Sequence, residues 1–291
     1  MFLNQQLRAA SVLAAIATVP LAVSSVPAQP QVQWTQTLNM PKGANLPPGV
    51  SADILGIELG ESHASAKAKI ERLHDESRAS EANKTLTEGD RTLRSGIPGA
   101  ATLTITHPAL IQLKTSVPGA GPRPIEEVLS VFVSAPSSGA QVVGIRRIIE
   151  YREHADQPRI TELIERLKEK FKSAPQVYPL GQHVQYRFVF HQGRAADPTK
   201  QNLATCNADN GIQSSVPLQM SEVPNWNHER ACDVILRLEI VYGVSKEHVG
   251  RINFLLSDNE RAKQNFMADY AFFDAYVKNI QSKSKGAVPK L

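Results

Sequence analysis

The sequence predicts an α+β fold built from two units, each a helix followed by an antiparallel meander of strands, with a further helix at the end. Three observations favour this fold class. Three stretches place apolar residues at helical spacing, and two groups of strand-like stretches lie between them. Nearly all loops between neighbouring strands are too short to hold crossover helices, so the strands are expected to pair antiparallel. The predicted order is therefore α-βββ-α-βββ-α.

The first 28 residues have the features of a secretory signal peptide. Arg8 ends a short positive region, an apolar run covers residues 9–23, and small residues precede an expected cleavage after Ala28. The run is shorter than the roughly 20 residues that span a bilayer, and no later stretch approaches that length, so no membrane span is expected after cleavage. No cysteine lies near the cleavage point, which argues against a lipoprotein. The mature protein is expected in the periplasm or outside the cell.

Residues 29–50 are rich in Gln, Pro and Gly without periodicity, which predicts a flexible leader. The first α+β unit is expected over residues 51–155. It opens at residues 53–73, where a short apolar strand runs into a turn and then an amphipathic helix that Ser62 caps. The buried face of this helix is predicted to carry Ala66, Ile70 and Leu73.

Three strands are predicted in the rest of the first unit. Residues 75–90, which precede them, are polar and unpatterned, which indicates a loop or a frayed extension of the helix. The second and third strands are joined by a turn at residues 136–139 and are expected to form an antiparallel hairpin. The Pro- and Gly-rich residues 118–124 predict a surface loop. The predicted strands are residues 101–114, 128–134 and 141–151.

The second unit, residues 156–282, is predicted to repeat the arrangement. Pro158 suits the first position of a helix that Pro175 ends. The apolar stripe of this helix comprises Ile160, Leu163, Ile164, Leu167 and Phe171. The predicted strands are residues 183–191, 233–242 and 250–256.

A third helix is expected to open with the capping-box spacing of Ser257 and Glu260. It is predicted to end before a Lys-rich tail at residues 283–291. Its buried face is predicted to carry Ala262, Phe266, Tyr270, Phe273, Val277 and Ile280.

The charge is nearly balanced, with a formal net charge of +4 at pH 7. The charges of both signs are scattered along the chain, and no clustered basic stripe of the kind that binds nucleic acid is present. The sequence therefore predicts an ordinary solvated surface and no nucleic-acid partner.

The two cysteines, Cys206 and Cys232, are expected to form a disulfide in an oxidising compartment, with two buried thiols as the alternative. The bond would brace a polar loop at residues 195–230, which is long for a compact domain. Because such loops often carry function, Asn225, Trp226 and His228 are candidates for a binding loop. The alternative is an insertion that the disulfide protects from proteolysis.

No catalytic, cofactor or metal site is assigned. Ser62 lies in a Gly-Glu-Ser-His-Ala turn that partly matches a hydrolase nucleophile elbow, but Ala64 replaces the second Gly and helix capping explains the serine more simply. The eight histidines lack metal-site spacing and are predicted to be scattered over the surface. His183 and His191 stand too far apart on one strand to share an ion. No phosphate-binding loop, dinucleotide fingerprint or calcium loop appears, so no cofactor is expected.

Two short motifs resemble sequences of bacterial envelope proteins. They are Gly-Ile-Glu-Leu-Gly at residues 56–60, before the helix that contains Ala66, and Leu-Lys-Glu-Lys-Phe at residues 167–171 with Ala-Pro following at 174–175. They resemble uncharacterised exported proteins and the small α+β domains of the BamE-like and β-lactamase-inhibitor-like group, where a Leu-Gly turn opens the first helix before a three-stranded meander. Glu61 stands where that group more often has Met, and its lipidation cysteine is absent. The resemblance implies protein binding at the envelope and carries over no functional residue.

These observations predict an exported, non-enzymatic binding or scaffolding protein of the envelope or periplasm, with an envelope protein as its partner. One alternative is a secreted hydrolase without a recognisable motif, for which Ser62 and the loop that carries His228 are the candidates. The other is a small-molecule binder that uses a groove between the helices and the aromatic strand at residues 183–191.

Overall fold

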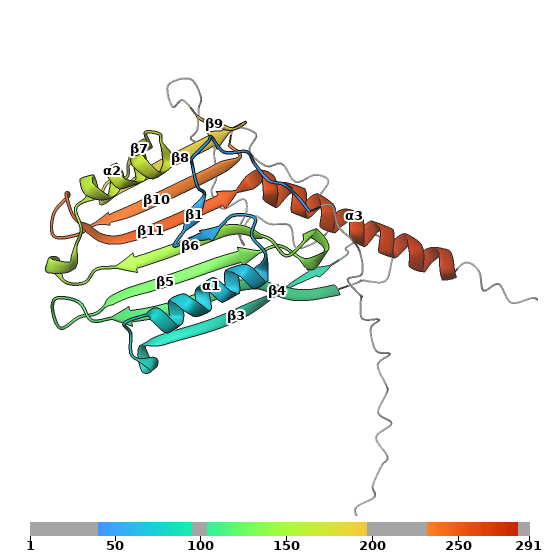
Figure 1. Ribbon diagram of the computed structural model, residues 1–291, viewed down its shortest axis with the longest axis horizontal. Coiled ribbons are helices and arrows are strands. Elements are labelled where there is room, and N and C mark those ends of the chain that lie inside the picture. The colour runs from blue at the N-terminus through green and yellow to red at the C-terminus, as the bar shows by residue number, and fades with distance from the viewer. Residues whose placement is uncertain (1–39, 95–103, 197–231, 285–291) are drawn as a thin grey trace, which may run out of the picture. The chain divides into compact units, whose positions relative to one another are not determined.

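The computed structural model describes residues 40–94, 104–196 and 232–284 of the 291-residue chain, and these form an α+β structure, as predicted (Figure 1). The helices are α1 (His63–Glu76), α2 (Ile160–Phe171) and α3 (Asn259–Ser284), with short 3-10 turns η1 (Glu81–Asn83), η2 (Pro136–Ser138) and η3 (His154–Asp156). The strands are β1 (Asp53–Ile54), β2 (Ile57–Glu58), β3 (Lys84–Arg94), β4 (Thr104–Val117), β5 (Ile125–Val133), β6 (Val142–Glu150), β7 (Gln176–Pro179), β8 (His183–His191), β9 (Arg194–Ala195), β10 (Val234–Tyr242) and β11 (Val249–Asp258).

Nine of these strands form one antiparallel sheet with the order β3-β4-β5-β6-β11-β10-β8-β7, in which β9 extends β8 on a branch. The strands β3 to β6 follow α1 as one meander, and β7, β8, β10 and β11 follow α2 in the same way. The two meanders meet where β6 pairs with β11. The prediction of three strands in each meander is therefore wrong, because each contains four.

The strands that the prediction missed are the two edges of the sheet, β3 and β7. Residues 75–90 were expected to be a loop or a frayed extension of the helix, which is wrong for residues 84–90, because they belong to β3 and pair with β4. Its side chains alternate weakly because an edge strand is solvated on much of its surface, and Leu93 is its one buried side chain. Pro108 of β4 stays within the strand, where a bulge between Gly89 and Asp90 interrupts the regular pairing.

The start of the first unit is a hairpin and not a single strand. β1 and β2 pair through a two-residue turn, in which Leu55 and Gly56 have φ values of 55° and 75°. Positive φ at both central residues is characteristic of a type I′ turn. Ser62 caps α1 as predicted, because its Oγ accepts a hydrogen bond from the Ser65 backbone N at 3.2 Å.

The helices α1 and α2 pack on the same face of the sheet (Figure 1), and the core lies between them and the strands. The predicted stripe of α2 is confirmed: Ile160, Ile164 and Phe171 are buried. The phenyl ring of Phe171 packs against Phe188 and Phe190 of β8, with ring centroids 5.4 and 6.1 Å apart. The prediction that Pro158 opens α2 is wrong, because the Pro158 carbonyl accepts a hydrogen bond from Val249 N at 3.0 Å and remains in an extended segment.

The last helix, α3, begins directly after β11. Its cap is Asp258, whose Oδ1 accepts the Arg261 backbone N at 2.8 Å, so the predicted Ser257–Glu260 capping box is wrong. Ser257 instead donates to Asn259 Oδ1 at 3.0 Å. The predicted apolar face is confirmed for Ala262, Phe266, Phe273 and Val277, which are buried. None of the helices in the described part of the chain is long and apolar enough to cross a membrane.

Arg261 joins the start of α3 to the residues that precede the first hairpin. Its guanidinium donates to the carbonyl oxygens of Pro41 and Lys42, at 2.8 and 2.6 Å, and its Nε donates to Asp258 Oδ2 at 3.2 Å. The same carboxylate accepts the Ala44 backbone N at 3.2 Å. Residues 40–50 contain no helix or strand, and this network fixes their beginning against α3.

Candidate functional site

The predicted binding loop lies mostly outside the described residues, and so do Cys206, Asn225, Trp226 and His228. Its two ends are described and flank β8 on opposite sides: Ala196 N donates to Val189 O at 2.8 Å, and Asp233 N donates to Phe190 O at 2.8 Å. Asp233 also contacts His191 Nδ1 at 3.0 Å. Cys232 is buried, and its pairing with Cys206 stays a prediction.

Ser62 has the surroundings of a helix cap. The side chain is exposed, and its described hydrogen bond is the one that it accepts from Ser65 N. A serine nucleophile needs a base within hydrogen-bond reach, and no such contact to Ser62 is present among the described residues. His183 and His191 occupy the two ends of β8. The described residues also contain no group of His, Cys, Asp and Glu that could hold a metal ion.

The sheet face opposite α1 and α2, which we call the polar face, carries a line of residues that crosses every long strand. Cross-strand pairing connects each member to the next. The line contains three arginines, Arg146, Arg237 and Arg187, which we call the arginine row. In order across the sheet, the residues are Thr87, Gln112, Ser130, Arg146, Leu255, Arg237, Arg187 and Gln176.

Two arginines of this row lie directly opposite each other. Arg187 and Arg237 are cross-strand partners, an arrangement in which like charges repel. Burial lowers the pKa of Arg187, and the positive charge of Arg237 lowers it further. The Arg187 guanidinium also stacks 4.6 Å from the centre of the Tyr178 ring and donates to Gln185 Oε1 at 2.6 Å. The row therefore concentrates guanidinium groups together with an aromatic ring.

Two arginines of the polar face are exposed to solvent, Arg146 on β6 and Arg251 on β11. Arg146 donates to the neutral amide of Asn253 at 3.1 Å. Neither arginine forms an ion pair with a carboxylate of the described residues. By contrast, Arg152 contacts Glu126 at 2.9 Å and Glu150 at 3.2 Å, so these two acidic groups of the same face are compensated.

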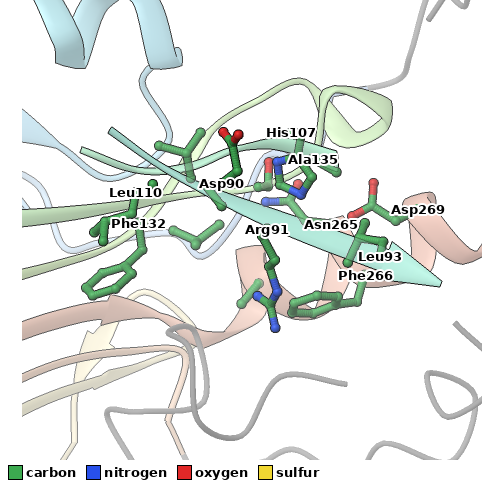
Figure 2. Close-up of a pocket in the computed structure, with 16 residues that line it drawn as sticks. Asp90, Arg91, Leu93, His107, Leu110, Phe132, Ala135, Asn265, Phe266 and Asp269 are labelled. Atoms are coloured by element: carbon green, nitrogen blue, oxygen red, sulfur yellow. The ribbon is translucent and has the colours of Figure 1, made fainter. Parts of the chain in front are cut away.

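A cavity lies at one end of the sheet, between α3 and the strands β3 to β6, and we call it the α3 cavity (Figure 2). Its volume is about 450 Å³, within the range of small-molecule sites. The apolar part of its wall includes Leu110, Phe132 and Phe266. The polar side chains come from three elements: Arg91 and Asp90 from β3, His107 from β4, and Asn265 and Asp269 from α3.

Two buried side chains of this wall have polar atoms without a hydrogen-bond partner among the described residues. His107 is 3 % exposed and Asn265 is 1 % exposed. His107 Nε2 and both polar atoms of the Asn265 carboxamide have no hydrogen-bond partner in residues 40–94, 104–196 and 232–284. The expectation that the histidines are surface residues is therefore wrong for His107. A buried polar atom without a partner costs roughly 1–3 kcal/mol, so both residues are unusual in a stable core.

Asp269 is fully buried beside the cavity. Its Oδ1 accepts a hydrogen bond from Ser137 Oγ in η2. Burial raises the pKa of Asp269 to about 7, although the Ser137 and Ser138 hydroxyls and the charge of Arg91 act in the opposite direction. Burial also lowers the pKa of Arg91 and of His107. The cavity is thus a poorly hydrated environment in which neutral forms are favoured.

Sequence analysis did not identify the α3 cavity, because its polar residues come from distant strands and match no motif. One signal was present. Asn265 and Asp269 are four residues apart and lie within the apolar stripe of α3, beside Ala262, Phe266 and Phe273. Polar residues at core positions of an amphipathic helix depart from the usual pattern and often mark a site.

Comparison of the chain with protein-family models, with curated proteins and with solved structures finds no match. The class of protein is therefore defined by the described fold: an α+β protein with one long antiparallel sheet, covered by α1 and α2 on one face. The other face carries the arginine row, together with buried apolar residues such as Ile235 and Leu255.

Proposed function

We propose that this protein is an exported, non-enzymatic protein-binding component of the bacterial envelope or periplasm, and that it binds its partner through the polar face. The observation that carries the proposal is the arginine row, in which Arg146 at one end is exposed. A sheet face that serves only as surface tolerates polar residues of any kind, but this one gathers guanidinium groups in one cross-strand line from β6, β10 and β8.

The expected partner is a protein that presents carboxylate side chains. Arginine forms bidentate hydrogen bonds to carboxylates and retains little hydration, which favours its use in interfaces. Arg146, Arg251 and Lys114 are exposed cations of the polar face that such a surface would meet. Tyr178, which lies against Arg187 at the far edge, adds the kind of aromatic residue that interfaces favour.

The ends of the predicted binding loop support the same surface. Ala196 and Asp233 bring both ends of the loop to β8 and β10, the strands that carry Arg187 and Arg237. We propose that Asn225, Trp226 and His228 extend the binding surface, and that the Cys206–Cys232 disulfide braces them.

The test compares two double variants that change the charge equally. Arg146→Glu/Arg251→Glu alters the polar face, whereas Arg72→Glu/Arg166→Glu alters exposed arginines on α1 and α2. The full chain and both variants are used to capture cross-linked proteins from envelope extract at low and high salt. We expect an acidic protein that the wild type and the helix variant capture, that the polar-face variant loses, and whose capture weakens with salt. Equal capture by both variants would contradict the proposal.

A further inference from the structure

Buried polar atoms at the α3 cavity lack hydrogen-bond partners within the described part of the chain. Asn265 is 1 % exposed, and both its amide nitrogen and its amide oxygen lack partners. His107, on the strand side of the same cavity, lacks a partner at Nε2. Figure 2 shows these side chains among the residues that line the cavity, with Phe132 and Leu110 on the apolar part of the wall. Two unsatisfied residues at one cavity indicate that a molecule from outside supplies the missing hydrogen bonds.

The protonation state of His107 shows which hydrogen-bonding group a ligand must present to its Nε2. His107 Nδ1 lies 3.0 Å from the Pro108 carbonyl oxygen, which can only accept, so Nδ1 carries the proton. The ring is neutral, since burial and the charge of Arg91 lower its pKa. Nε2 is therefore a hydrogen-bond acceptor, and its partner must be a donor.

The Asn265 carboxamide shows which further hydrogen-bonding groups the ligand must carry. It offers two N–H donors and one oxygen acceptor, so it is complementary to a group that contains both an acceptor and a donor. An amide has this pair in fixed geometry and no net charge. A charged head is disfavoured, because the apolar side chains provide little solvation and burial at this wall already raises the pKa of Asp269, which favours its neutral form.

We infer that the α3 cavity binds a small uncharged amide, with its amide head at Asn265 and His107 and an apolar ring or short chain against Leu110, Phe132 and Phe266. The volume of about 450 Å³ accommodates a molecule of this size. This binding activity is independent of the polar face and of the function proposed for it. A ligand with a single donor, such as an alcohol, could donate to His107 Nε2 but would leave the Asn265 amide oxygen without a donor.

The test uses three matched probes with the full chain: para-butylbenzamide, para-butylacetophenone and butylbenzene. They share the apolar body and differ in the head, which is an amide, an acceptor alone, or absent. Isothermal titration or ligand-observed NMR should show the amide binding at least about tenfold more tightly than either comparison probe, the size expected for paired buried hydrogen bonds. Equal affinity of the three probes, or no binding of the amide, would overturn the inference.

Two variants localise the binding. Asn265→Leu keeps the side-chain size and removes the polar atoms, and it should reduce amide affinity about tenfold while leaving butylbenzene affinity unchanged. The same variant should raise the melting temperature of the unliganded protein by about 2–4 °C, because an unsatisfied buried group is lost. Ala109→Leu narrows the cavity from a half-buried position and should weaken all three probes. A lower melting temperature for Asn265→Leu, or unchanged binding in Ala109→Leu, would show that the cavity is not the site.

Discussion

The two faces of the sheet have opposite compositions. The face under α1 and α2 is almost entirely apolar, and Phe188, Phe190 and Leu238 on it have no exposed surface. The opposite face alternates with it along the same strands and carries the arginine row. Figure 1 shows α1 and α2 on one side of the sheet, and α3 continues from the end of β11. The difference indicates that the covered face supplies most of the hydrophobic burial that stabilises the fold, although the polar face also buries Ile235 and Leu255.

The largest expected effect comes from the covered face. Phe188→Ala removes a fully buried ring that packs on Phe171, and it should lower the free energy of unfolding by about 3–5 kcal/mol. Ile148→Ala, a partly exposed residue of the polar face, is the control and should cost less than half as much. Urea unfolding of both variants measures the two values. Similar losses would mean that the polar face is buried as deeply as the covered face.

The second prediction concerns the loss of stability when the contact between the start of α3 and residues 40–50 is broken. Arg261→Met removes the partner of the buried Asp258 carboxylate and the donors to Pro41 and Lys42, so it should cost about 3–5 kcal/mol. Arg152→Met, which breaks exposed pairs on the polar face, should cost about 1 kcal/mol or less. The comparison is made by urea unfolding. If Arg261→Met lowers the free energy of unfolding only slightly, water supplies the hydrogen bonds that the guanidinium otherwise donates.

The sequence predicted elements that are buried on one face better than elements at the edges. The bounds of β8 were correct at both ends, because Val184, Tyr186 and Phe188 alternate with Gln185 and Arg187. β3 was missed, since Thr and Glu positions on a solvated edge strand carry no such alternation. The first hairpin was read as one strand because Leu55 in the turn is apolar, although its φ of 55° places it in the left-handed region.

The candidate sites were less accessible to sequence reasoning than the fold. The arginine row depends on cross-strand register, which joins Arg146, Arg187 and Arg237 from positions far apart in the chain. Side-chain periodicity assigns each residue to a face of its own strand but does not determine which residues become neighbours. The α3 cavity depends in addition on where the helix crosses the sheet, which no local pattern specifies.

A pH-dependent effect tests the environment beside the α3 cavity. Burial raises the folded-state pKa of Asp269 to about 7, whereas the unfolded chain has a value near 4, so the folded protein binds the extra proton between these values. This group's contribution to the free energy of unfolding is therefore greatest below about pH 4. It falls by up to about 1.4 kcal/mol per unit as pH rises to about 7.

The matched variant is Asp269→Asn, which keeps an oxygen for Ser137 and cannot ionise. Asp258, whose pKa burial also raises, acts in the same direction, and His107, whose pKa is lowered, acts in the opposite one. The difference between wild type and variant isolates Asp269 from both. Urea unfolding from pH 4 to 8 should show wild type losing stability relative to the variant as pH rises. Parallel curves would mean that the Asp269 carboxylate ionises without cost.

The smallest effect concerns Ser62, which caps the helix on the covered face and is the candidate nucleophile of the hydrolase alternative. Loss of the cap in Ser62→Ala should lower the free energy of unfolding by about 1 kcal/mol, because Ser65 N loses its acceptor. Ser62→Asp retains an acceptor at the cap and should restore that stability. Hydrolysis of ester probes by the full chain separates the two roles, since aspartate can cap a helix but cannot replace a serine nucleophile. An activity that both variants abolish, with stability kept in Ser62→Asp, would favour the hydrolase over the binding protein.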